Sequence, residues 1–597
     1  MRGFIVLFDT EPQAARPADD PLLQRLRQWT EASPAGQLLH AQLPACSVYR
    51  YGSDAVVPAD FNQHLVVGPG ALTLWTGPRV DLTPPALLAA PASHQPAEQL
   101  KAAREASRLL DSAVCVSYRA DTHTLQVRTD ALASTAVYWV RSGRWLLVSN
   151  ASLMLARLAR CAVDPVAASE FLASGSIYGN RALYAGVQSL PPASVLVFGA
   201  GSAGPAGEAY WPLHALPFGS LSLQQARDQI IAELDEDFAT LDATGRHFIA
   251  DLTGGYDSRT NLGFALRKLK RFETTVSGTP QDEDVVLSSQ LARQLGLKHT
   301  VIAPPADDDG HWAARLDAAT LATDLEYDIV EYARIYHAQT RFDQLRQPSI
   351  HGSIGDIARN YLLRPEFCNG GPEGGLIVEP LIAQRFRSLI PAAMGRPGLP
   401  IAQWEQHMRE RIALHDRPEL PVYARLDILY LRMRMQFWQG RIASSTNRYR
   451  ASFSPFVNRR VVEAMLCPGW RERDHQMLSR VLLKALHPGL GRVVVSRGAP
   501  AGPGVMDVLA GLPTRMRYYA SRVAVRLGRV PASPVAASAT QLLWPGWEQT
   551  LAPVLLDEAI AGLTQPGGLA SQPQVFGRLM SLSRTRRLLD TWPPRPL

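Results

Sequence analysis

Residues 252–258 read Leu252-Thr253-Gly254-Gly255-Tyr256-Asp257-Ser258 and lie between two segments of different periodicity. The apolar run at 248–250 is typical of a buried strand, and the pattern at 261–268 is typical of a helix. A strand, a Gly-rich turn and a helix in this order gather backbone N–H groups and a helix N-terminus around one point, where an anion is favoured. We interpret the segment as a cradle for the phosphates of ATP.

The side chains of this segment fit the interpretation. Gly254 and Gly255 let a phosphate approach the backbone closely. Ser258 supplies a hydroxyl donor, and Asp257 supplies a hard oxygen ligand for Mg²⁺. These seven residues also leave open an ordinary strand-to-helix turn, in which Gly, Asp and Ser serve as turn and cap residues.

Strand and helix patterns alternate from residue 248 onward. We expect strands at 248–252, 272–277 and 299–303, helices at 257–269 and 284–295, and a helix at 326–345 that leads to a strand at 349–352. This alternation predicts a doubly wound α/β domain with a parallel sheet, followed by a mostly helical part at 420–495. In such sheets, ligands bind beyond the carboxyl ends of the strands where the strand order reverses.

A second acidic loop follows the predicted strand at 349–352. It contains Gly352, Ser353 and Asp356. If this strand and the strand at 248–252 are neighbours, Asp257 and Asp356 face one crevice and hold Mg²⁺ between phosphates. The alternative role for Asp356 is to cap a helix at 357–363.

The first 215 residues have a different pattern. Short β runs with turn residues between them recur from 4–8 to 145–149, and a helical segment near 166–174 precedes a further run at 195–198. We expect an antiparallel, β-sandwich-like α+β domain with few helices.

Composition sets outer limits on function. The 597 residues suggest about two to four domains. The net charge of +7 is spread along the chain, which suits a polyanionic ligand without requiring nucleic acid. The five cysteines are far apart, with no CxxC pair, and no apolar run reaches the length of a membrane span or of a secretory signal. We expect a cytoplasmic protein.

Taken together, these segments resemble the asparagine synthetase family, which includes β-lactam synthetases and lasso peptide cyclases. The loop at 252–258 is similar to the family's SGGxDS loop, with Thr253 in place of Ser, and 352–356 is similar to its second metal-binding loop. Further similar segments are 183–198, 285–299, 454–458 and 481–500. The resemblance implies an Ntn-type, glutamine amidotransferase-like domain over 1–215 and an ATP-pyrophosphatase domain over 216–597.

The resemblance also implies a chemistry. Members of the family activate a carboxylate with ATP as an acyl-adenylate, release pyrophosphate and form an amide with a nitrogen nucleophile. It implies Mg²⁺ ligands at Asp257 and Asp356, and a catalytic cation at Arg497 in place of the family's late lysine. The implied ATP-binding residues are Leu252, Thr253, Gly254, Gly255, Tyr256, Asp257, Ser258, Val276, Ser277 and Gly352; adenine or ribose would contact the strand end at Val276 and Ser277.

Departures from the family pattern narrow the function. The glutamine-hydrolysing members carry a cysteine nucleophile where this chain has Arg2, so we expect no glutaminase activity. Residues 451–453 read Ala-Ser-Phe rather than the family's Glu-Ala-Arg, which argues against free aspartate as substrate. Ser353 stands where β-lactam synthetases have tyrosine.

We therefore expect a lasso peptide cyclase that joins a peptide's N-terminal amine to one of its own Asp or Glu side chains as a macrolactam. Its partners would be a precursor peptide, a leader peptidase and a leader-binding protein. Three alternatives stay open: another amidoligase of the same superfamily, a catalytically silent scaffold, and an RNA-modifying enzyme, against which the lack of basic blocks and CxxC pairs counts.

Overall fold

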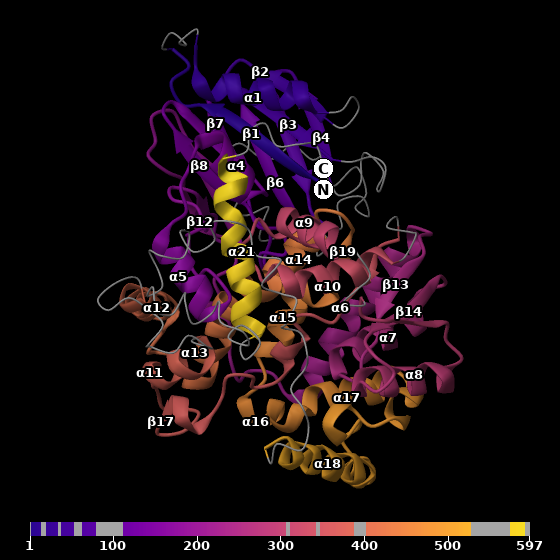
Figure 1. The fold of residues 1–597 in the computed structure, drawn as a ribbon. Coiled ribbons are helices and arrows are strands. Elements are labelled where there is room, and N and C mark those ends of the chain that lie inside the picture. Colours follow the sequence, from indigo (N-terminus) through magenta and orange to yellow (C-terminus); the bar gives the residue numbers. More distant parts are fainter. Residues whose placement is uncertain are drawn as a thin grey trace.

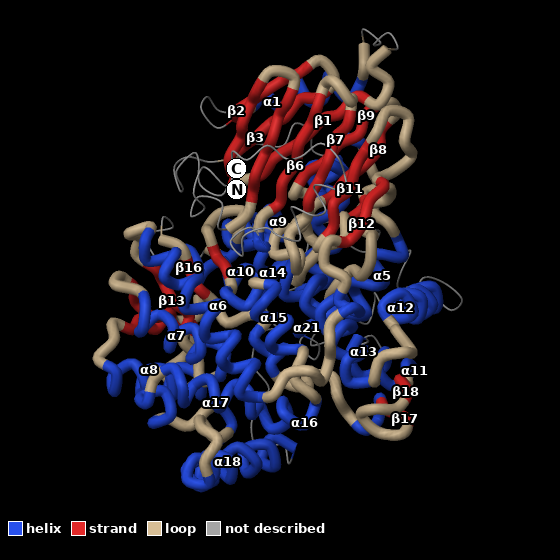
Figure 2. The backbone as a smooth tube through the Cα atoms, turned by 180° about the vertical axis from the view of Figure 1, so that it is seen from behind, coloured by secondary structure: helices blue, strands red, loops and turns tan. Residues whose placement is uncertain are grey.

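The computed structural model describes residues 2–13, 19–33, 38–52, 63–78, 111–305, 311–341, 347–386, 401–526 and 573–590. Two six-stranded antiparallel sheets lie at one end of the molecule, and a five-stranded parallel sheet surrounded by helices lies beyond them (Figures 1 and 2). The predicted sequence of an antiparallel region followed by a parallel α/β region is confirmed.

The first antiparallel sheet has the strand order β10-β8-β9-β1-β3-β2 and the second has the order β12-β11-β7-β6-β5-β4. The strands of the first sheet are β1 (Gly3–Asp9), β2 (Leu38–Leu43), β3 (Cys46–Tyr51), β8 (Tyr138–Ser142), β9 (Trp145–Ser149) and β10 (Gln188–Ser189). Those of the second are β4 (Gln63–Gly68), β5 (Ala71–Thr76), β6 (Val114–Arg119), β7 (Thr124–Arg128), β11 (Ser194–Phe198) and β12 (Ala206–Ala209).

Strand β1 shows how the layers form. Its side chains alternate between the two faces of the sheet. Phe4, Val6 and Phe8 pack into the core between the two sheets, whereas Ile5 and Leu7 pack against helices on the other face. The result is a layer of helices, a sheet and a second sheet. The core on the helical face includes residues of α1 (Pro21–Ala32), α4 (Ser152–Ala159), α5 (Pro165–Ser174), α9 (Trp312–Thr323), α10 (Ile329–Thr340) and α21 (Pro573–Asp590).

The parallel sheet has the strand order β15-β14-β13-β16-β19, and every pair in it is parallel. In chain order the first strand, β13, therefore lies at the centre, and the strand order reverses between β13 and β16. The strands are β13 (Phe248–Asp251), β14 (Phe272–Ser277), β15 (His299–Ile302), β16 (Ser349–Ile350) and β19 (Ser452–Phe453). Helices that share its core include α6 (Leu223–Ala243), α7 (Tyr256–Lys268), α8 (Glu283–Leu295), α15 (Arg459–Leu466) and α17 (Met477–Leu486).

The structure corrects one predicted helix in this region and decides one alternative. The helix expected at 326–345 is shorter, Ile329–Thr340, and the alternative helix at 357–363 is absent, because Asp356 lies in a 3-10 turn, Gly355–Ala358. The segment 420–495 is mostly helical, as expected, and it also contains β19, the fifth strand of the parallel sheet. It also contains a π-helix at Tyr430–Gln439, which the 3.6-residue period does not reveal.

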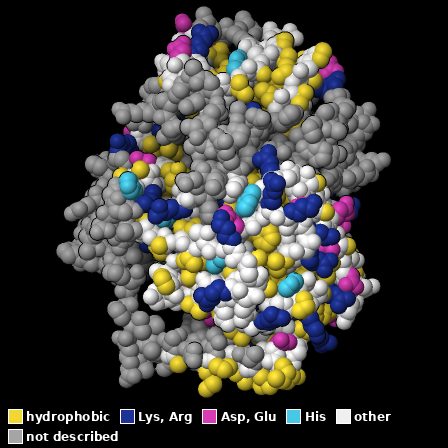
Figure 3. Space-filling view, turned by 90° about the vertical axis from the view of Figure 1, so that its right-hand side faces the viewer, with side chains coloured by type: hydrophobic (Ala, Val, Ile, Leu, Met, Phe, Trp, Pro, Cys, Tyr) yellow, Lys and Arg dark blue, Asp and Glu magenta, His cyan; other side chains and the backbone are white. Residues whose placement is uncertain are grey.

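The remaining elements lie in the lower half of Figure 1, except α14, which lies in the middle of the molecule beside α10 and β19. They are β17 (Cys368–Asn369), β18 (Gly375–Leu376), α11 (Val378–Leu381), α12 (Ile401–His415), α13 (Val422–Leu429), α14 (Gly440–Thr446), α16 (Trp470–Arg473) and α18 (Val505–Arg526). Helix α18 presents hydrophobic side chains to the surface at the bottom of Figure 3, among them Val505, Met506 and Met516. None of the described helices combines the length and the apolar character that crossing a bilayer requires.

The expected boundary near residue 215 falls between β12 and α6. Helices α9, α10 and α21 come after that point in the chain, yet they share the core on the helical face of the first antiparallel sheet. Figure 1 shows α21 running along the molecule beside α5. One core therefore contains residues from both sides of the expected boundary, and the division into 1–215 and 216–597 stays a prediction.

Candidate active site at the parallel sheet

The loops that follow β13 and β16 meet at the point where the strand order reverses. The two strands are neighbours, with Ile249 paired to Ser349 and Ala250 to Ile350. A Cβ atom at Gly352 would lie 2.8 Å from the backbone nitrogen of Ser258, so the loops touch through glycine. The prediction that the two strands are neighbours is confirmed, and the two acidic loops lie against each other. We call the region where these loops meet the crevice; that it binds Mg²⁺ and ATP stays a prediction.

The N–H groups of Thr253, Gly254 and Gly255 all bond to side-chain oxygens of the chain itself. Thr253 N–H donates to Ser258 Oγ at 3.0 Å, and Gly255 N–H donates to Thr253 Oγ1 at 3.1 Å. Gly254 N–H donates to a carboxylate oxygen of Asp284 at 2.9 Å. The loop thus already holds an anionic oxygen at Gly254, and a phosphate that used this donor would have to displace Asp284.

The carboxylate of Asp257 has fewer stabilising partners than that of Asp356. It lies in the first turn of α7, and no described residue donates a hydrogen bond to its side chain. Burial, and then the nearby charge of Asp356, raise its pKa, while Arg359 opposes the shift. A Cβ atom at Gly355 would lie 2.5 Å from Asp257 Cγ, so this loop closes directly over the carboxylate.

Asp356 is held from two sides. Arg359 forms an ion pair with it, and Tyr430 Oη donates to its second oxygen at 3.3 Å. Tyr430 in turn stacks on Tyr361, with ring centroids 4.5 Å apart. The loop before Asp356 carries strain, because Ile354 has φ of 79°, a region that β-branched residues rarely adopt.

The two carboxylates fit a Mg²⁺ ion that also binds phosphate. Two like charges interact across the crevice, and Asp257 lacks any donor that would neutralise it. No group of three or more His, Cys, Asp or Glu side chains in the described ranges is placed to hold a metal. Mg²⁺ commonly takes one or two carboxylates and completes its shell with water and substrate phosphates, so two are sufficient here.

The late basic loop lies against the Gly-rich loop. Ser496 N–H donates to Gly254 O at 2.9 Å, and Arg497 N–H donates to Glu283 Oε1 at 2.6 Å. Arg497 is exposed and has φ of 63°. The guanidinium of Arg259 fixes the start of this loop by donating to the carbonyl oxygens of Val493 and Val494. Arg497 therefore lies next to the crevice, although its catalytic role stays a prediction.

The other expected ATP-binding residues occupy varied positions. Leu252 is fully buried, and its N–H bonds to Thr275 O, so this residue supports the sheet. Tyr256 is buried and donates to Pro500 O at 2.5 Å, which ties α7 to the late loop. At the end of β14, Val276 is buried, whereas Ser277 is exposed.

Sequence reasoning missed Asp284, Arg359 and Tyr430. The carboxylate of Asp284 accepts a hydrogen bond from Gly254 N–H. Its place in the first turn of α8, the helix that follows β14, is a signal that could have revealed it. Tyr430 comes from a π-helix far along the chain, and the sequence gives no comparable signal for it.

Arg2 stands where the sequence resemblance would place a cysteine nucleophile, and it is buried directly before β1. Its N–H donates to Arg448 O at 2.7 Å. Its side chain packs against Gly52, where an added Cβ atom would lie 2.9 Å from Arg2 Cγ. A guanidinium is not a nucleophile. The contacts of Arg2 are those of a side chain that packs within the fold.

Comparisons with known proteins give no assignment of family. No family model matches the chain, and no curated protein matches it. Among solved structures, the chain has a distant similarity to glutamine phosphoribosylpyrophosphate amidotransferase from B. subtilis complexed with ADP and GMP, at 10% identity and a TM-score of 0.19. The match covers 59% of this chain and 81% of that chain. At such a TM-score the likeness carries no argument about activity.

Proposed function

We propose that the chain is an ATP-dependent, AMP-forming C–N ligase, and that it closes the macrolactam ring of a lasso peptide precursor. The observation that carries the proposal is the meeting of two Gly-containing acidic loops, with Asp257 and Asp356, at the point where the order of the parallel strands reverses. This is where open α/β sheets bind their ligands. The broader class of ligase rests on this geometry, and the choice of a lasso peptide rests on the sequence resemblance.

Each group in the crevice has a task in this proposal. Asp257 and Asp356 would hold Mg²⁺, which when bound neutralises phosphate charge. The Gly-rich loop and the N-terminus of α7 would orient the part of ATP that leaves as pyrophosphate. Arg497 would stabilise negative charge on the activated carbonyl or on the tetrahedral intermediate.

The nitrogen nucleophile would come from the peptide itself. Arg2 supplies no thiol for glutamine hydrolysis, so ammonia has no source in this chain. The peptide's N-terminal amine attacks the acyl-adenylate, the amide bond forms and AMP leaves. The net change in the peptide is the loss of one water.

Product analysis tests the proposal. The protein is incubated with ATP, Mg²⁺ and linear precursor peptides that carry a free N-terminus and one internal Asp or Glu. We expect AMP, pyrophosphate and a peptide lighter by one water, with its amine and one acidic side chain blocked. Asp257→Asn and Asp356→Asn should abolish the product, whereas Asp235→Asn, on the surface of α6, should not.

Three outcomes would overturn the proposal. Release of ADP and phosphate would show that ATP is cleaved at its γ-phosphate and not at its α-phosphate. Amidation by added ammonia or by glutamine would show that the nucleophile is not the peptide's N-terminal amine. Full activity of Asp257→Asn at low Mg²⁺ would show that the crevice is not the site.

A further inference from the structure

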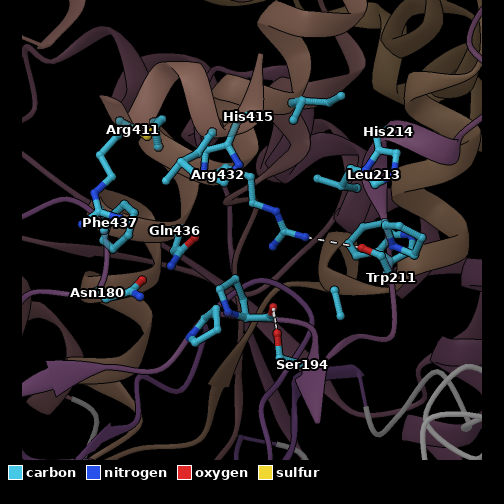
Figure 4. Close-up of a pocket in the computed structure, with 18 of the residues that line it drawn as sticks. Asn180, Ser194, Trp211, Leu213, His214, Arg411, His415, Arg432, Gln436 and Phe437 are labelled. Carbon is cyan, nitrogen blue, oxygen red and sulfur yellow. Dashed lines mark hydrogen bonds between the residues drawn. The ribbon is translucent and has the colours of Figure 1, made fainter. Parts of the chain in front are cut away.

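A second site lies outside the crevice, where the antiparallel sheets meet the helices of 401–437. It is a cavity of ≈ 400 Å³, and it shares no lining residue with the loops after β13 and β16. One wall comes from the N-terminal region and includes Asn180, Ser194 and Trp211. The other comes from α12, α13 and the π-helix and includes Arg411, His415, Arg432 and Phe437 (Figure 4).

The cavity is strongly basic. Three guanidinium groups, those of Arg411, Arg417 and Arg432, line it, and no Asp or Glu is among the described residues of its walls. Burial, and then the three arginines, lower the pKa of His415 to about 4. His415 is therefore neutral at pH 7 and can accept or donate a hydrogen bond, while the net charge of the walls stays positive.

Arg432 is the centre of this site. Its guanidinium reaches into the open middle of the cavity, between Gln436 and Trp211 (Figure 4). Its one hydrogen bond to a described residue is long, 3.5 Å from Nη2 to Trp211 O. Burial lowers its pKa to about 10, so it is charged at neutral pH. The side chain of Arg432 is half-buried, and no carboxylate of the described walls pairs with its charge.

The rest of the lining is mostly apolar. Ile428, Met433 and Phe437 lie on the helical wall, and Leu213 and Trp211 face them from the N-terminal region. The volume lies within the range of small-molecule sites. A ligand that satisfies both surfaces has an anionic group for the arginines and an apolar body for these side chains.

We propose that this cavity binds an organic carboxylate with an apolar body, whose carboxylate pairs with Arg432. A planar guanidinium and a carboxylate match in a two-point hydrogen bond, which favours carboxylate over a halide. Arg411 and Gln436 lie on the same side of the cavity and bind the ligand's remaining polar atoms (Figure 4). The carboxylate belongs either to the end of a short peptide or to a free small molecule.

The position of Arg432 connects this site to the crevice. Arg432 and Tyr430 belong to the same π-helix, and Tyr430 bonds to Asp356. π-helical turns are rare and frequently occur at functional sites. The binding of the carboxylate itself does not depend on ATP, so its test is separate from that of the proposed ligase activity.

Calorimetry without ATP or Mg²⁺ tests the site. The probes are N-acetyl-Leu-Phe with a free carboxylate, its C-terminal amide, 3-phenylpropionate and inorganic phosphate. We expect the free acids to bind and the amide not to bind. Arg432→Gln should weaken binding by about tenfold to a hundredfold, the range for loss of a charged hydrogen bond. Arg411→Gln, on the helical wall, should weaken it less.

The matched control is Arg409→Gln. Arg409 lies on α12, two residues from Arg411, but is exposed and pairs with Glu379 at 2.8 Å, so its loss should leave binding unchanged. Tighter binding of the dipeptide than of 3-phenylpropionate supports a peptide as the source, and the reverse supports a small metabolite; both support the site. Equal binding of acid and amide, preference for phosphate, or unchanged affinity in both Arg432→Gln and Arg411→Gln would overturn it.

Discussion

Asp324 and Glu326, beside the antiparallel sheets, accept hydrogen bonds on every carboxylate oxygen, whereas Asp257, in the crevice of the parallel sheet, accepts none from a described residue. Asp324 is bonded by Arg448 at 2.8 Å and by Ser152 N–H at 2.9 Å. Glu326 is bonded by Ser152, Leu183 N–H, Tyr138 and Arg441, at 2.8 to 3.1 Å.

Hydrogen-bond partners therefore distinguish buried acids that stabilise the fold from buried acids that are available for chemistry. Burial raises the pKa of Glu326, to about 8, and it also raises that of Asp257, so the shift alone does not distinguish them. The partners do. A buried carboxylate with all its donors is part of the architecture, and one that faces a like charge without donors is poised for a cation.

The largest expected effect is a loss of stability when one of the two acids beside the antiparallel sheets, Glu326, is replaced. Glu326→Ala should destabilise the protein by about 3–5 kcal/mol, because it leaves the guanidinium of Arg441 buried without its partner. Urea unfolding measures the loss. Glu208→Ala, at an exposed position of β12, is the control and should change stability by less than about 0.5 kcal/mol. A similar small change at Glu326 would contradict its structural role.

The next effect is on catalysis at the edge of the crevice. Arg497→Ala should lower kcat by about 10²–10³, the usual result of removing one electrostatic contact with the transition state, without loss of stability. Arg497→Lys should recover part of the rate if charge alone matters. Steady-state rates of pyrophosphate release give the measurement. If Arg497→Ala keeps the wild-type kcat, the cation is elsewhere.

A smaller effect should follow from crowding Asp257. Gly355→Ala places a Cβ atom 2.5 Å from Asp257 Cγ and must displace the carboxylate. A shift of about 1 Å in a catalytic group costs roughly a hundredfold in rate. Gly491→Ala, where a Cβ atom meets nothing within 4 Å, is the matched control and should keep full activity. Equal rates for the two variants would show that the position of Asp257 is not critical.

The smallest effect is a dependence of stability on pH. The folded-state pKa of Asp257 is raised, so the folded protein binds its proton more tightly than the unfolded chain does. Wild-type stability should therefore fall relative to Asp257→Asn as pH rises from about 3.9 through the raised pKa. Unfolding in EDTA should show the variant as more stable at pH 8 and equal to the wild type below pH 4.

Mg²⁺ provides the check on that result. Adding the ion at pH 8 should stabilise the wild type more than Asp257→Asn, since binding to the folded state adds to stability. If Asp257→Asn is no more stable than the wild type at pH 8, ionisation of Asp257 does not destabilise the folded protein.

Much of the crevice could be predicted from the sequence. The alternation of strands and helices placed Asp257 and Asp356 after strands, and the reversal of strand order brought them together. Tyr430 and Arg432 could not be predicted in the same way, because their roles depend on how distant helices pack. Asp284, in the first turn of the helix that follows β14, had a usable signal in its position. The strand Ser452–Phe453 has only two residues, too few to show a period. The π-helix departs from the period that reveals other helices.

The proposed role of Asp257 and Asp356 depends on Mg²⁺-dependent binding of ATP, which can be measured without any turnover. Calorimetric titrations with ATP, with and without Mg²⁺, compare the wild type, Asp257→Asn, Asp356→Asn and, as the structural counterpart, Glu326→Gln. We expect Mg²⁺-dependent binding to the wild type, a loss of at least about tenfold in affinity for each crevice variant, and wild-type affinity for any folded Glu326→Gln. Equal affinity in the wild type and in both crevice variants would contradict it.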